Sequence, residues 1–81
     1  MAGVYDDRGL IVGEDRHGST RHFAPLFGFG HLPDHLQRVS RACAELAQDM
    51  VDNLPDGPEL STGLRKLLEA KDCFVRAALP Q

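Results

Sequence analysis

The chain has 81 residues and a formal net charge of −3, which leaves room for one domain with a small core. Neither half is strongly basic and no apolar run approaches the ~18 residues of a membrane span, so we expect neither a long nucleic acid nor a membrane as a partner. The two cysteines form no disulfide framework, and the first residues lack the basic and apolar regions of a signal peptide, so we expect a cytoplasmic protein.

Residues 1–31 have the composition of an N-terminal arm, because they hold six of the eight glycines and three of the four histidines. Short apolar segments at residues 4–5 and 10–12 fit a small hairpin, but two isolated strands are not stable in water, so we expect the arm to be ordered only by contact. Three phenylalanines between residues 23 and 29 carry too much apolar area for solvent. This aromatic segment is expected to pack on helices or on another chain.

Residues 32–81 are expected to form a helical hairpin. Pro33 and Asp34 are typical of a first helical turn, and apolar residues then recur at steps of three and four for about 20 residues. Two prolines and a glycine between residues 55 and 58 end this helix, and Glu59 opens a second helix that runs to about Leu79. A short link between two helices predicts antiparallel packing.

Two helices cannot bury both of their wide apolar stripes, and the folding free energy of so few residues comes out near zero. We therefore expect an all-α fold: an antiparallel two-helix hairpin with an N-terminal arm, completed by oligomerisation. The uncovered stripe would meet the same stripe of a second copy across a symmetry axis. A helix of a different protein is the alternative partner.

Lys71 interrupts the apolar stripe of the second helix. At about 100° per residue it falls among the apolar side chains of that helix, which are Leu60, Leu64, Leu67, Leu68, Phe74, Val75 and Ala78. The hairpin register places Lys71 opposite Cys43, on a helix with no acid on its apolar face. The anion that its ammonium meets is then Asp72, a carboxylate of the arm, a carboxylate of a second copy or a ligand phosphate. The alternative is that the ammonium reaches water or a backbone carbonyl. We favour a carboxylate of a second copy, and a ligand phosphate is the more informative alternative.

The aromatic segment also has features of an anion pocket. Gly28 and Gly30 allow a ligand close to backbone amides, the first helix begins just after them with its positive dipole end, and Arg38 lies one turn into that helix. Phe27 or Phe29 would then stack on a base. The alternative is a segment that plugs the open end of the hairpin.

No residue pattern predicts catalysis or a metal. His31 and His35 have helical ligand spacing, but Pro33 lies between them and two further ligands are not placed. Cys73 falls on the polar face with no histidine near it in sequence, and Cys43 is expected to be buried. We therefore predict no catalytic residue, no metal and no cofactor, and a protein that is not an enzyme.

Three segments carry a resemblance to a known family: residues 27–33 (FGFGHLP), residues 54–61 (LPDGPELS) and residues 64–70 (LRKLLEA), with Gln37 after the first. Over about residues 27–78 the chain resembles the helical-hairpin domain of phage anti-CBASS and anti-Thoeris sponge proteins. The resemblance implies a small homo-oligomer, often a hexamer in that family, that binds an immune signal without cleaving it.

The function implied is immune evasion by sequestering a cyclic di- or trinucleotide or a cyclic ADP-ribose-type signal in the host cytoplasm. The resemblance also implies a stacking ring from the arm, for which Tyr5 is the candidate, and hydroxyls after the turn. The candidate ligand-binding residues are Tyr5, Phe27, Gly28, Phe29, Gly30, His31, Arg38, Ser61, Thr62, Arg65 and Lys71. The alternative function is a helical oligomerisation or adaptor module with no small-molecule ligand.

Overall fold

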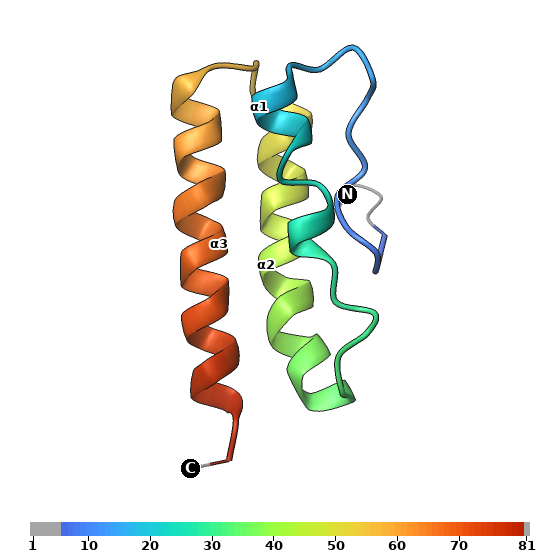
Figure 1. Cartoon of the computed structure of the whole chain (residues 1–81), viewed down its shortest axis with the longest axis vertical. Coiled ribbons are helices and arrows are strands. Elements are labelled where there is room, and N and C mark those ends of the chain that lie inside the picture. Colours follow the sequence, from blue (N-terminus) through green and yellow to red (C-terminus); the bar gives the residue numbers. More distant parts are fainter. Residues whose placement is uncertain (1–5, 81) are drawn as a thin grey trace.

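The computed structural model describes residues 6–80 of the chain, so the predictions on residues 4–5, Tyr5 among them, lie outside the described residues. Four helical elements follow one another: α1 (Gly18–Arg21), the 3₁₀ helix η1 (Pro25–Phe27), α2 (Asp34–Asn53) and α3 (Pro58–Ala78). Figure 1 shows α2 and α3 as antiparallel neighbours, with the arm running along α2. The all-α fold and the hairpin are as predicted, and oligomerisation stays a prediction.

Local sequence explains where the two long helices begin and end. The carbonyl of Pro33 accepts the first amides of α2, from Leu36 and Gln37, both at 2.9 Å. Leu54 leaves the helix in an extended conformation, which a residue before proline favours. Gly57 then reverses the chain with a φ of +157°, a value that L side chains rarely adopt. None of the helices between residues 6 and 80 has the length and apolarity to cross a membrane.

The core lies between the arm and the hairpin. The arm contributes Leu10 and three aromatic rings to it, and Phe27 and Phe29 are the largest fully buried side chains. The hairpin contributes Ala44, Ala47, Val51, Leu60 and Leu64. The expectation that the aromatic segment packs on the helices is therefore confirmed within one chain, and the ordering contact that the arm needs comes from its own hairpin.

Gln48 of α2 holds the middle of the arm. Its side chain is only 2% exposed, and its Oε1 accepts the Ile11 amide at 2.8 Å while its Nε2 donates to the Ile11 carbonyl at 2.9 Å. Nε2 also donates to the Asp52 carboxylate at 3.0 Å. A buried amide thus pairs with Ile11 as a neighbouring strand would, so residues 10–12 are fixed without a second strand.

Asp56, in the turn between α2 and α3, fixes residues 16–20 of the arm. It accepts the His17 amide at 2.9 Å, the Thr20 hydroxyl at 2.6 Å and the Arg16 Nε at 3.0 Å. Arg16 also donates to the carbonyls of Val51 at 2.7 Å and Leu54 at 2.9 Å, at the C-terminus of α2. The bond from Thr20, followed by those from His17 and Arg16, lowers the pKa of Asp56 to about 2.

Candidate functional site

A cavity of about 410 Å³ lies where the arm, the first half of α2 and the second half of α3 meet. Its volume is within the range of small-molecule sites, roughly 300–1,000 Å³. Its lining residues are Pro25, Leu26, Gly28, His31, Leu32, Ser40, Lys71, Asp72, Val75 and Arg76. We call this cavity the Lys71 pocket.

Lys71 contributes a nearly buried cation to the pocket. Its side chain is 13% exposed, its Nζ donates to the Leu26 carbonyl at 3.2 Å, and it lies 3.3 Å from Oδ1 of Asp72. Lys71 therefore contacts two of the partners predicted for its ammonium, the Asp72 carboxylate and a backbone carbonyl. Within the chain, the carboxylate that meets Lys71 is that of Asp72, the next residue of the same helix, and the favoured carboxylate of a second copy stays a prediction.

Ser40 contributes a buried hydroxyl without a partner. It is fully buried in the middle of α2, and its Oγ has no hydrogen-bond partner among the described residues. A buried hydroxyl left without a hydrogen bond costs about 1–3 kcal/mol in proteins. Ser40 is among the residues that line the Lys71 pocket, and a movement of the pocket wall would be needed to bring a polar ligand atom to its hydroxyl.

The mouth of the pocket carries both signs of charge. Arg76, one turn after Asp72 on α3, is exposed and donates to Sγ of Cys73 at 3.4 Å. His31 is exposed on the arm side. Asp72 is half exposed, so its carboxylate can turn into water at little cost when another anion approaches Lys71.

Cys43, on α2, is not among the residues that line the pocket, and it is not an activated thiol. Cys43 is buried, and this burial raises the pKa of its thiol, while the positive charge of Lys71 acts in the opposite direction. The influence of Lys71 on this thiol agrees with the hairpin register that places the two residues opposite each other. The Cys43 thiol is therefore neutral near pH 7 and contributes packing.

Three of the predicted ligand-binding residues come together in the Lys71 pocket: Gly28, His31 and Lys71. The prediction that Phe27 or Phe29 stacks on a base is wrong, because the two rings are 0% and 2% exposed in the core. Phe29 makes a cation–π contact with Arg41, whose guanidinium carbon lies 5.5 Å from the ring centre.

The predicted cradle of glycine amides is also wrong. The Gly28 amide donates to the Pro25 carbonyl at 3.3 Å, and the Gly30 amide donates to the Asp7 carbonyl at 2.8 Å. A Cβ at Gly28 would come within 2.7 Å of the Arg8 carbonyl oxygen. The two glycines therefore let the arm approach itself closely, and they present no free donors to an anion.

The other predicted residues lie elsewhere on the molecule. Arg38 is exposed in a shallow depression at the start of α2, and Arg65 is exposed on α3. Ser61 donates to the carbonyls of Gly57 and Pro58, and it lines a separate cavity near the turn. Thr62, next to it, is half buried. The predicted set is therefore dispersed over several surfaces and does not form one site.

Sequence reasoning missed Ser40. The signal was present, because Ser40 falls among the buried positions of α2, four residues after Leu36 and three before Cys43. A polar residue at such a position needs a partner.

No protein-family model, no curated protein and no solved structure matches the chain.

Proposed function

We propose that this protein binds a small anionic ligand, a cyclic nucleotide signalling molecule, in the Lys71 pocket and holds it without cleaving it. The observation that carries the proposal is that one cavity is lined both by Ser40, whose buried hydroxyl has no partner among the described residues, and by Lys71, whose side chain is 13% exposed. Phosphate oxygens accept hydrogen bonds from both types of donor, and charge-assisted bonds of this kind are the strong ones.

The charges around Lys71 support reversible anion binding. Of the three ammonium hydrogens, one is directed to the Leu26 carbonyl, and the Asp72 contact is with a carboxylate that is half exposed. A ligand phosphate can replace Asp72 beside Lys71 and leave that carboxylate hydrated. Arg76, at the mouth, adds a second cation for the ligand.

The groups around the pocket favour holding the ligand over cleaving it. Activation of a serine needs a base within hydrogen-bond reach, and among the described residues no base pairs with the Ser40 hydroxyl. Cys43 is a neutral buried thiol. The resemblance to phage sponge proteins supplies the ligand class, cyclic di- or trinucleotides or cyclic ADP-ribose isomers, and the cytoplasm of an infected cell as the place of action.

The test is a thermal-shift panel of cyclic dinucleotides, cyclic trinucleotides and cyclic ADP-ribose isomers, followed by titration calorimetry of any compound that raises the midpoint. A ligand at 100 times its Kd stabilises the folded state by about 2.7 kcal/mol. Heating the complex should release the compound intact. A panel in which no compound raises the midpoint would refute the proposal, and recovery of a cleaved product would refute its non-enzymatic part.

A specific feature favours the alternative function, a helical assembly module. Exposed apolar side chains line the far side of the hairpin, where Leu46 is 48% and Phe74 is 55% exposed. If the panel gives no shift while the chain self-associates, the assembly module is the better interpretation.

A further inference from the structure

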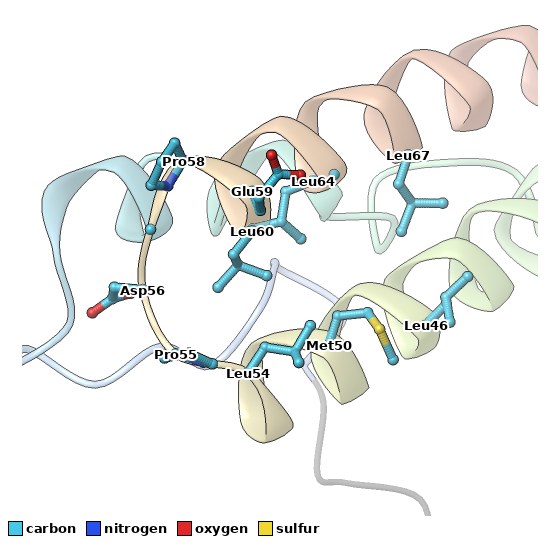
Figure 2. A pocket seen from close by; sticks show the side chains of 12 residues that line it. Leu46, Met50, Leu54, Pro55, Asp56, Pro58, Glu59, Leu60, Leu64 and Leu67 are labelled. Atoms are coloured by element: carbon cyan, nitrogen blue, oxygen red, sulfur yellow. The ribbon is translucent and has the colours of Figure 1, made fainter.

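An apolar groove of about 480 Å³ lies between α2 and α3 near the turn that joins them. Figure 2 shows Leu46, Met50 and Leu54 of α2 facing Leu60, Leu64 and Leu67 of α3 across it. No residue of the arm lines this groove, whereas four residues between 25 and 31 line the Lys71 pocket. The groove is thus the part of the hairpin that the arm leaves uncovered.

The uncovered surface is longer than the groove. Leu46, Met50, Leu54 and Phe74 are 48%, 37%, 44% and 55% exposed. At about 100° per residue, Ala70 and Phe74 continue the side of α3 that carries Leu67, and Val39 and Ala42 continue the side of α2 that carries Leu46. We call this surface the groove face, and its residues are Val39, Ala42, Leu46, Met50, Leu54, Leu60, Gly63, Leu67, Ala70 and Phe74.

Around the middle of the groove face, charges of opposite sign border its two long edges, with Arg38 and Glu59 farther along those edges. On α2, Glu45 and Asp49 lie one turn apart, about 100° and 60° from Leu46 and away from the core. On α3, Lys66 lies about 100° from Leu67, again away from the core, and Glu59 lies on the same edge two turns nearer the turn. Glu45, Asp49 and Lys66 form no ion pair within residues 6–80.

The hairpin register sets these charges at one height. Leu46 of α2 and Leu67 of α3 lie across the groove from each other in Figure 2. Met50 and Gly63, each four residues nearer the turn, are then level as well. By the same register Lys66 is level with Ala47, midway between Glu45 and Asp49. The acidic edge and the basic edge therefore match in height while lying on opposite sides of the same face.

We propose that two copies of this chain pack groove face to groove face about a two-fold axis that runs parallel to the hairpin. This rotation sets α2 of one copy against α3 of the other at equal height and closes a four-helix core. Glu45 and Asp49 of each copy then flank Lys66 of the partner subunit. A two-fold axis across the helices would instead set α2 against α2, acid facing acid, so the charges select the parallel axis.

This dimer does not depend on ligand binding, because the Lys71 pocket is lined by the arm and the groove face is not. The first test is the mass of the intact chain by sedimentation equilibrium and light scattering up to about 100 μM, where a pair with a Kd of ~1 μM is almost fully associated. We expect twice the monomer mass. A monomer at every concentration would overturn the proposal, whatever other protein the groove face were later found to bind.

Two kinds of variant test the face and its orientation. Leu46→Glu changes a half-exposed residue and should raise the dimer Kd at least about tenfold, with helix content by circular dichroism unchanged. Glu69→Lys, on the far side of α3, is the matched surface control and should leave the Kd unchanged. A dimer that survives Leu46→Glu would overturn the assignment of the face.

Charge reversal tests the axis. The double variant Glu45→Lys with Asp49→Lys should weaken association several-fold at low salt, because each new lysine meets Lys66 of the partner subunit. Adding Lys66→Glu to that variant should restore association. Failure of the third substitution to restore it would overturn the parallel axis, since only that axis brings these edges together.

Discussion

Replacing Ser40 by alanine should make the unliganded protein more stable. Its Oγ is fully buried without a partner among the described residues, and removing such a group recovers about 1–3 kcal/mol. Alanine adds roughly 0.5 kcal/mol of helix propensity in the middle of α2. For a domain of this size each 1 kcal/mol shifts Tm by about 4–8 °C, so calorimetry or circular dichroism should show a rise of several degrees.

Ser61→Ala is the matched control for this gain. Ser61 is also helical, but its hydroxyl donates to the carbonyls of Gly57 and Pro58 at 3.2 and 3.3 Å. Alanine there gains similar propensity and loses a made hydrogen bond of about 0.5–1.5 kcal/mol, so Tm should stay level or fall.

Ligand binding should respond to Ser40→Ala in the opposite direction from stability. If the hydroxyl is kept unpaired to meet a ligand, Ser40→Ala should weaken cyclic nucleotide binding at least about tenfold while raising Tm. A Tm that falls, or that moves no further than in Ser61→Ala, would refute the view that Ser40 is an unsatisfied group.

Further substitutions test the pocket, the core and the turn. Lys71→Met should lower the free energy of unfolding by no more than about 1 kcal/mol and weaken ligand binding at least tenfold by calorimetry, with exposed Arg65→Met as the silent control. Phe27→Ala should cost about 3–5 kcal/mol in chemical denaturation, because the ring is fully buried, and a loss below about 1 kcal/mol would contradict its core position. Asp56 has a folded pKa of about 2 against 3.8, so its contribution is present above pH 4 and is lost as pH falls toward 2. Asp56→Asn should therefore reduce the dependence of Tm on pH in that window. The dependence that remains would come from Asp6, whose pKa is also lowered to about 2. An unchanged dependence of Tm on pH would refute the role of Asp56.

Local signals in the sequence were sufficient for the two long helices. The three-and-four spacing of apolar residues, the proline at the start of α2 and the Gly57 turn each act within a few residues, so the bounds follow from local rules. The register that set Lys71 opposite Cys43 follows from the short link between the helices.

The arm could not be predicted in the same way. Its position depends on contacts between residues far apart in sequence, such as Gln48 with Ile11 and Arg16 with Val51, and no periodicity reports them. The glycine amides looked available for a ligand because the sequence does not show that the Asp7 carbonyl already accepts one of them. One signal was present: Gln48 falls at a core position of α2, and its side-chain amide needs hydrogen-bond partners there, which a backbone segment can supply.

The fold can accommodate the charge of Lys71 in the apolar stripe of α3, because different parts of this stripe face different surroundings. Leu64 lies at its centre in the core, Val75 borders the Lys71 pocket, and Leu67 borders the groove. Lys71 extends to the side that the arm covers, where the Leu26 carbonyl meets its ammonium. The Leu26 carbonyl and the Asp72 carboxylate give the ammonium partners there, so the stripe tolerates a cation at position 71. The groove side of α3 is lined by apolar and small residues, with Glu59 near the turn as the charged exception, and such a surface suits the proposed contact with a second copy.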